Sequence, residues 1–111
     1  MIHLKIKALS VNQVWAGRRF KTPAYKKYEK DVTILLPKIK LPDPPYELQV
    51  ECGFSNKASD LDNILKPLID ILQKKYNFND KEIYSLIMRK MIVKKGNEYI
   101  KITINNFNIN N

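Results

Sequence analysis

Residues 46–54 alternate apolar and polar side chains along their whole length, and this pattern constrains the fold more than any other part of the chain. The apolar positions are Tyr46, Leu48, Val50, Cys52 and Phe54, and the polar positions between them are Glu47, Gln49 and Glu51. A period of two predicts a β-strand with one face in the core. Other elements must cover that face, so the chain is expected to build a layered fold around this strand.

The N-terminal third predicts one strand, one loop and one helix. Residues 2–6 alternate and predict a half-buried strand, and residues 9–21 are expected to form a loop. Thr22-Pro23 predicts a helix start, with a capping side chain followed by proline at the first helical position. Pro37 is expected to end this helix. Its predicted buried side chains are Tyr25, Tyr28, Val32, Leu35 and Leu36.

The C-terminal half predicts a second helix and two further strands. The helix is expected from about residue 62 to 76, and its predicted buried side chains are Leu65, Leu68, Ile69 and Leu72. Residues 83–94 and 98–107 are rich in β-formers, and Lys95-Gly96-Asn97 between them predicts a hairpin. The resulting order β-α-β-α-β-β predicts an α/β protein of the α+β type, with a small mixed sheet of about four strands and two helices.

Length and composition predict a single domain over residues 1–111, because 111 residues with 44% hydrophobic side chains can form one core. With 20 Lys and Arg against 11 Asp and Glu, the net charge of +9 favours a polyanionic partner such as DNA. The sequence contains no apolar run long enough to span a membrane and no signal-peptide pattern. One cysteine, Cys52, excludes an internal disulfide, and we expect a cytoplasmic protein.

Four aspartates between residues 60 and 80 stand out in this basic chain: Asp60, Asp62, Asp70 and Asp80. Carboxylates repel phosphate, so such a cluster makes best sense if a divalent cation lies between acid and phosphate. Helical spacing places Asp62, Lys66 and Asp70 on a shared face, and Asp60 just before the helix start. Mg²⁺ prefers such hard oxygen ligands. The spacing alone leaves two alternatives open, because one acid could be only an N-cap and the others only surface ion pairs.

Residues 60–70 read Asp-Leu-Asp-Asn-Ile-Leu-Lys-Pro-Leu-Ile-Asp, and residues 79–83 read Asn-Asp-Lys-Glu-Ile. Together with Ser10-Val11-Asn12-Gln13-Val14-Trp15, they resemble the RusA family of Holliday junction resolvases. The signature of that family is D-x-D-N-x-x-K-x-x-x-D, followed by a short turn and a further acid before a strand. The resemblance implies a Mg²⁺-dependent homodimeric endonuclease that makes paired cuts in four-way DNA junctions during recombination and repair, with Mn²⁺ as a possible substitute.

The resemblance also implies roles for individual residues. Asp60, Asp62 and Asp80 would be the metal-binding catalytic acids and Lys66 the catalytic lysine, while Asp70 is a further candidate ligand. The chain departs from the family where Asn77 replaces a turn glycine and where Lys57 stands in place of an arginine of some relatives. Asn77 can adopt the left-handed conformation that such a turn needs.

DNA contacts are expected outside the acid cluster. The candidate DNA-binding residues are Asn12, Trp15, Arg18, Arg19, Lys21 and Lys57, within a wider basic surface that includes Lys5, Lys7, Lys26 and Lys27. Trp15 could stack on an exposed base or lie in the core, and the sequence favours neither. His3 and Cys52 are interpreted as structural. Two other functions remain open: a non-catalytic DNA-binding accessory protein, and a nuclease that acts on other branched DNA.

Overall fold

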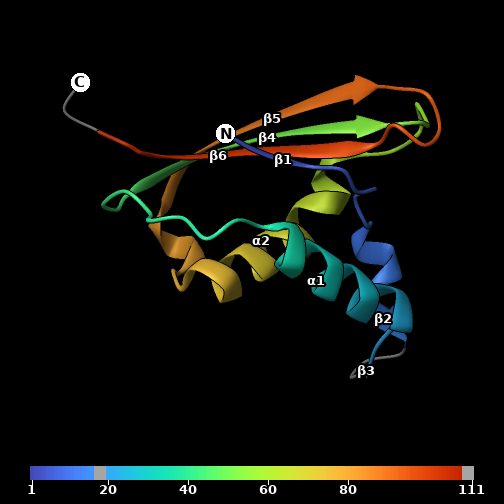
Figure 1. Ribbon diagram of the computed structural model, residues 1–111, viewed down its shortest axis with the longest axis horizontal. Coiled ribbons are helices and arrows are strands. Elements are labelled where there is room, and N and C mark those ends of the chain that lie inside the picture. The colour runs from blue at the N-terminus through green and yellow to red at the C-terminus, as the bar shows by residue number, and fades with distance from the viewer. Residues whose placement is uncertain (17–19, 109–111) are drawn as a thin grey trace.

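The computed structural model describes residues 1–16 and 20–108, which form a sheet with two helices on one of its faces (Figure 1). The principal elements are β1 (Ile2–Leu4), α1 (Pro23–Leu35), β4 (Tyr46–Phe54), α2 (Leu61–Tyr76), β5 (Ile83–Ile92) and β6 (Tyr99–Asn106). Their order is the predicted β-α-β-α-β-β, and the α+β class with a four-stranded mixed sheet is confirmed within the described residues. No helix of this part of the chain is long and apolar enough to cross a membrane.

The strand order β1-β6-β4-β5 shows that the predicted hairpin between β5 and β6 is wrong, because β4 lies between them. Strand β5 pairs parallel to β4, since α2 carries the chain back to the end of the sheet where β4 began. Strand β6 then takes the other edge of β4 in the antiparallel sense. A turn at residues 94–97 contains Gly96 at φ +96°, a conformation that favours glycine. A local turn signal was therefore present, but it could not specify which strands pair.

The core lies between the sheet and the helices, and the predicted alternation of β4 is confirmed. All five apolar side chains of that strand are buried. On α2 the buried side chains are Ile64, Pro67, Leu68, Ile71 and Leu72. The prediction was correct for Leu68 and Leu72 but wrong for Leu65 and Ile69, which are only half-buried. On α1 the side chains of Tyr25, Tyr28 and Val32 are buried, as is Leu36 just after the helix, but Leu35 is 46% exposed.

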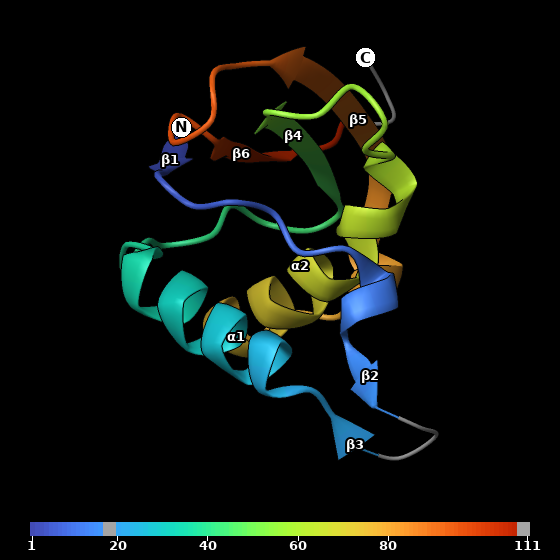
Figure 2. The same ribbon diagram turned by 90° about the vertical axis from the view of Figure 1, so that its right-hand side faces the viewer.

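The predicted N-terminal loop contains short regular elements that position the start of α1. They are the 3-10 helix η1 (Val11–Gln13) and the strand pair β2 (Trp15–Ala16) and β3 (Phe20–Lys21), which projects beside the helices (Figure 2). Thr22 caps α1 by accepting a hydrogen bond from the backbone N–H of Tyr25 at 3.1 Å, which confirms the predicted helix start. The Thr22 hydroxyl also donates to the Gln13 carbonyl and so ties η1 to α1.

Candidate active site

One exposed side of α2 carries alternating acids and lysines, opposite the side that packs in the core. The residues Asp62, Lys66, Asp70 and Lys74 follow one another at intervals of four, and we call them the polar stripe. The stripe is exposed because Ile64, Leu68, Ile71 and Leu72 fix the opposite side of the helix against the sheet. The same apolar spacing that buries α2 therefore turns the acids outward.

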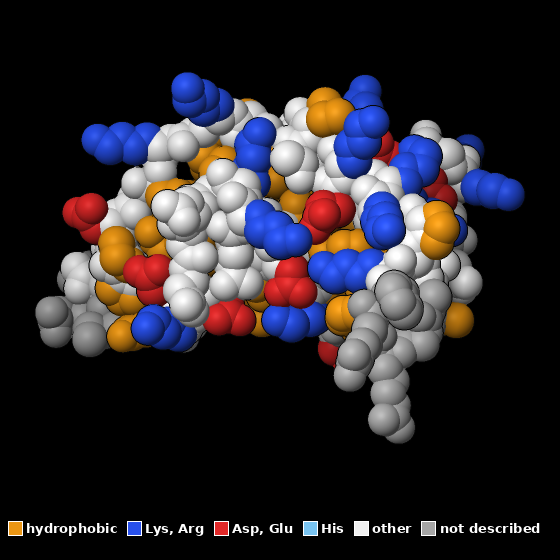
Figure 3. All heavy atoms as spheres, turned by 90° about the horizontal axis from the view of Figure 1, so that it is seen from below, with side chains coloured by type: hydrophobic (Ala, Val, Ile, Leu, Met, Phe, Trp, Pro, Cys, Tyr) orange, Lys and Arg blue, Asp and Glu red, His pale blue; other side chains and the backbone are white. Residues whose placement is uncertain are grey.

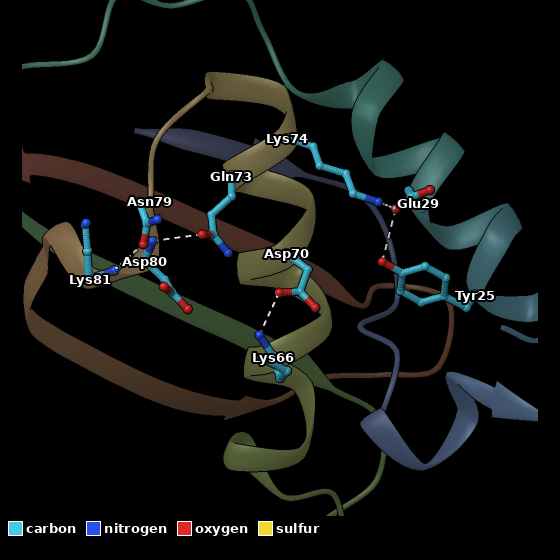
Figure 4. Close-up of polar contacts among 9 residues, drawn as sticks. All are labelled: Tyr25, Glu29, Lys66, Asp70, Gln73, Lys74, Asn79, Asp80 and Lys81. Carbon is cyan, nitrogen blue, oxygen red and sulfur yellow. Dashed lines mark hydrogen bonds and ion pairs between the residues drawn. The ribbon is translucent and has the colours of Figure 1, made fainter. Parts of the chain in front are cut away.

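Lys66 is the centre of this stripe. Its Nζ lies 2.9 Å from Oδ1 of Asp70 (Figure 4). The hydrogen bond and the charge of Asp70 raise the pKa of Lys66, and the charge of Asp80 contributes to the same effect. Because a raised pKa keeps the amine protonated at neutral pH, Lys66 can stabilise negative charge but is poorly suited to accept a proton.

Asp80 reaches the same region from the turn that follows α2. Asn77 ends the helix at φ +55°, the left-handed conformation that the sequence was expected to tolerate here. The short 3-10 helix η2 (Asp80–Glu82) then begins with a reciprocal cap between Asn79 and Glu82. The backbone N–H of Asp80 donates to Oε1 of Gln73 at 2.8 Å, so α2 itself holds this turn (Figure 4).

Asp60 immediately precedes α2, but it does not act as a conventional N-cap. Its side chain makes no capping hydrogen bond with the helix backbone and accepts only a long one of 3.4 Å from Nδ2 of Asn63. Asp62 lies exposed in the first turn of α2, where the helix dipole favours a negative charge. The simple capping alternative therefore does not account for either acid, whereas the alternative of a surface i,i+4 ion pair is confirmed for Lys66 and Asp70.

The donor chemistry of these acids fits Mg²⁺, although one chain does not gather them into a closed set of ligands. All four candidates are carboxylates, the hard oxygen ligands that this ion prefers. Within residues 1–16 and 20–108, no three Asp, Glu, His or Cys side chains lie close enough together to hold a metal ion. The structure instead brings Asp70 and Asp80 to Lys66, with Asp60 and Asp62 at the N-terminal end of α2. The metal site stays a prediction.

The two motifs of the family resemblance meet at that end of α2. A hollow of about 410 Å³ lies between η1 and the helix start, and Asn12, Asn63 and Asp60 are among its lining residues. Ser10 and Gln13 hold η1 through a reciprocal cap, which keeps Asn12 at the rim. Asn12, predicted to contact DNA, therefore lies beside one of the predicted catalytic acids.

The other predicted DNA contacts are more dispersed. Trp15 is 49% exposed, so the core alternative is wrong for this residue. The ammonium of Lys21 lies 5.9 Å from the Trp15 ring centroid and 4.5 Å from that of Tyr25. Lys57 is exposed, and its backbone carbonyl accepts a hydrogen bond from Lys90 of β5. Arg18 and Arg19, also predicted to contact DNA, lie outside the described residues.

The structural interpretation of His3 and Cys52 agrees with their surroundings. His3 packs edge-on against the ring of Tyr99 on the neighbouring strand β6, with 5.4 Å between the ring centroids. The Cys52 side chain is fully buried in the core, and burial raises the pKa of its thiol to about 12. A thiol with so high a pKa is a poor nucleophile at neutral pH.

A link between α1 and α2 was missed by sequence reasoning. Glu29 accepts hydrogen bonds from the Tyr25 hydroxyl at 3.1 Å and from Nζ of Lys74 at 2.9 Å (Figure 4). The hydrogen bond from Lys74 lowers the pKa of Glu29. The available signal was the position of Lys74, four residues after Asp70, which makes it the next member of the polar stripe.

The lysines beside this link form a basic groove, also missed, of about 480 Å³ between α1 and α2. Its lysines are Lys26, Lys30, Lys74 and Lys75. Only Lys74 among them makes an ion pair with an acid of the described chain. Figure 3 shows this helical side of the molecule, where acidic side chains lie centrally among many Lys and Arg side chains. Acids flanked by cations suit a metal-dependent reaction on a phosphate backbone better than either charge alone.

A family model described as endodeoxyribonuclease RusA matches residues 8–105 of this chain. The chain belongs to the RusA family. No curated protein matches the sequence. The match spans both resembling motifs, from the Ser10–Trp15 segment to the acid after α2, so the family resemblance of the sequence is confirmed. For a RusA-family chain the relevant reaction class is endonucleolytic cleavage of DNA, and the polar stripe and basic groove of α2 have the charges that such a reaction needs.

Proposed function

We propose that this RusA-family protein is a Mg²⁺-dependent endonuclease that resolves four-way (Holliday) DNA junctions by paired cuts in recombination and repair. The observation that carries the proposal is the Lys66 ammonium held by Asp70, with Asp80 nearby, on an exposed side of α2. The family match over residues 8–105 supports the same reaction class. We place the reaction in the cytoplasm, in keeping with the single buried thiol of Cys52.

The chain's own residues would divide the chemistry between them. Asp60, Asp62 and Asp80, with Asp70 as a further candidate, would hold Mg²⁺, for which Mn²⁺ could substitute. A bound Mg²⁺ polarises a phosphate oxygen and lowers the pKa of a coordinated water. Lys66 would place its positive charge beside the phosphate and stabilise the charge that develops there. Where it is not a ligand, Asp70 would act as a positioning residue that orients the Lys66 ammonium through their 2.9 Å contact.

Binding would depend on cations along the helical side of the molecule. The basic groove between α1 and α2 continues the polar stripe through Lys74, so a DNA strand cleaved beside Lys66 could extend into this groove. Lys21 and the exposed ring of Trp15 would add a phosphate contact and a stacking surface. Asn12 would contact the nucleotide next to Asp60.

Paired cleavage requires two active sites, and one chain supplies a single polar stripe. We therefore propose that the protein acts as a homodimer with two-fold symmetry, which matches the symmetry of a four-way junction. Each subunit would cut one of two symmetric strands. This proposal is independent of which surface joins the subunits.

Cleavage assays on synthetic four-way junctions, flaps and plain duplex test the proposal directly. We expect junctions to be cut in Mg²⁺ or Mn²⁺, not in EDTA, and poorly in Ca²⁺, which imposes a looser coordination geometry. Undiminished cutting in EDTA would contradict the metal mechanism. Preferential cutting of flaps would favour the nuclease for other branched DNA. Tight binding without cutting in Mg²⁺ or Mn²⁺ would favour the accessory protein.

A further inference from the structure

The outer edge of β5 is unusually apolar for an exposed strand. β5 is ten residues long and ends the sheet, because no strand of the described chain pairs with its far side. Ten large apolar side chains are exposed in the described residues, and five of them lie on this strand. They are Tyr84, Leu86, Ile87, Met91 and Ile92. This concentration on one strand indicates an interface rather than scattered exposure.

Strand β1 forms the opposite edge of the sheet, and this edge is protected against pairing with another strand, whereas β5 is not. Strand β1 has only three residues, and both of its apolar side chains, Ile2 and Leu4, are buried. Short edge strands are one of the ways in which proteins avoid unwanted pairing. On β5 the ammonium of Lys90 is already engaged by the carbonyls of Lys57 and Ser59, which leaves Arg89 as the main outward charge. A long apolar edge of this kind readily accepts another strand.

We propose that β5 is the subunit interface of the homodimer, with the β5 edges of two copies pairing antiparallel about a two-fold axis at Ile87. This inference rests on the homodimer of the proposed function and specifies where it forms. Pairing would join two four-stranded sheets into one of eight strands and remove the exposed edge of both copies.

The faces of β5 limit which registers are allowed. Leu86 and Met88 lie in register with the core-facing residues of β4, whereas Ile87 and Arg89 lie in register with residues of the open face. Residues opposite each other in an antiparallel pair point to the same face, so the two-fold axis must pass through a residue. An axis at Ile87 places Ile87 against its own copy and Leu86 against Met88. Apolar side chains then meet apolar side chains on both faces.

Charge selects the same register. With the axis at Ile87, Arg89 faces Ser85 of the partner subunit, and Ser85 lies in register with Glu47 on β4. The Arg89 guanidinium would therefore come near a carboxylate of the partner. An axis at Met88 would instead oppose Leu86 to Lys90, whereas the axis at Ile87 sets Lys90 against the aromatic ring of Tyr84. An axis at Arg89 would oppose two guanidinium groups. The complementary charges and the apolar pairs thus both favour a two-fold axis at Ile87.

Analytical ultracentrifugation of the full chain, alone and on junction DNA, tests the interface through Ile87→Lys. Two ammonium groups would face each other at the axis beside both Arg89 side chains, so we expect the dimer dissociation constant to rise by at least about 100-fold. The control is Ile39→Lys, which adds the same charge at an exposed loop position and should leave the dimer unchanged. A melting curve for each variant checks that it is folded.

Cross-linking through Ile87→Cys tests the axis without adding charge. The two thiols would lie directly opposite, so mild oxidation should give a disulfide-linked dimer, while the fully buried Cys52 should not react. The control Met91→Cys lies on the same face with the same 44% exposure. Its two thiols would be about 27 Å apart and should not cross-link.

The outcomes separate this inference from the proposed function. A wild-type dimer that is lost in Ile87→Lys and cross-linked in Ile87→Cys supports the β5 interface. A wild-type dimer that survives Ile87→Lys, or cross-links equally through Met91→Cys, overturns the interface and leaves the homodimer standing. A wild-type chain that is monomeric both free and on junction DNA overturns both. Loss of cutting with the dimer intact concerns the nuclease proposal alone.

Discussion

The polar stripe of α2 and the outer edge of β5 belong to consecutive elements of one β4-α2-β5 unit, but they expose opposite chemistry. The stripe alternates Asp and Lys over about three helical turns, and its central Lys66–Asp70 ion pair is partly exposed. The edge exposes large apolar side chains along a ten-residue strand. One surface is suited to a charged substrate and the other to a protein surface.

If cleavage uses the polar stripe and the dimer forms at β5, as we propose, then reaction and assembly lie on separate surfaces of the same small unit. Exposed charges on a helix are common and cost the fold little. Exposed apolar strand residues are a liability unless a partner covers them. If the comparison is correct, substitutions in the stripe should alter cleavage without changing the dimer. Substitutions on the edge should disrupt the dimer, and with it paired cutting, while leaving the residues of the stripe intact.

The largest expected effect is loss of cutting in Asp62→Asn and Asp80→Asn. Each change keeps the side-chain shape but removes the charge of a proposed metal ligand, so we expect cleavage to fall by about 100-fold or more. Junction affinity should hold or rise, because a carboxylate near phosphate is repulsive. Gel assays of cutting and binding, with ultracentrifugation for the dimer, measure the three properties separately.

Asp43→Asn is the matched control for these two variants, since Asp43 is exposed in the connector before β4 and is not part of the stripe. It should cut normally. Full activity of Asp62→Asn and Asp80→Asn would mean that these acids are only structural. Equal loss in all three variants, with lowered melting temperatures, would instead indicate unfolding.

Lys66→Ala should reduce cutting by about 100-fold, because it removes the positive charge that we propose stabilises the phosphate. Affinity should fall only slightly, since one cation among many adds little to the salt-dependent total. Lys66→Arg should recover part of the activity by keeping the charge, although its geometry differs. Lys81→Ala, next to Asp80 and exposed, is the control for removing a nearby lysine. An active Lys66→Ala protein would exclude the proposed role of Lys66.

How far these surfaces could be predicted from sequence depends on the range of the contacts that make them. Periodicity identified both helices, the central strand and the outward position of Asp62, Lys66 and Asp70, because these follow from local geometry. The pairing of β5 was mispredicted as a hairpin with β6, since a turn signal at Gly96 says nothing about a strand inserted from earlier in the chain. The apolar edge of β5 became visible only once that pairing was known.

The candidate site shows the same difference between local contacts, which the sequence predicts, and long-range contacts, which it does not. The spacing of residues 60–70 placed Asp62 and Asp70 on one helix with Asp60 just before it, and the turn at Asn77 brought Asp80 back as expected. The contact of Lys74 with Glu29 joins residues 45 positions apart, and the basic groove exists only where α1 and α2 pack together. Neither could be deduced from the spacing within a single element.

Lys30→Ala and Lys75→Ala should weaken junction binding moderately and leave the cutting rate at saturating DNA unchanged. Each lysine that contacts a phosphate contributes about 0.9 to the slope of log affinity against log salt, so the slope should fall by about that amount per variant. Lys94→Ala and Lys95→Ala, on the exposed connection between β5 and β6, are the controls. Equal slopes for all four variants would show that the groove is not a preferred DNA contact.

Arg89→Ala should have the smallest effect on the dimer, and it tests whether Arg89 contributes to the contact across the β5 edge. Arg89 lies 3.7 Å from Glu51 within its own chain, but its side chain is 69% exposed, so this ion pair constrains it weakly. In the β5-paired dimer it would come near Glu47 of the partner subunit, and we expect its loss to raise the dimer dissociation constant by about twofold to fivefold at low salt only. Lys101→Ala is the matched control, because Lys101 also lies 3.7 Å from Glu51 but belongs to β6, away from the edge. An equal effect of both variants, measured by sedimentation, would mean that Arg89 acts through Glu51 in its own chain and not across the interface.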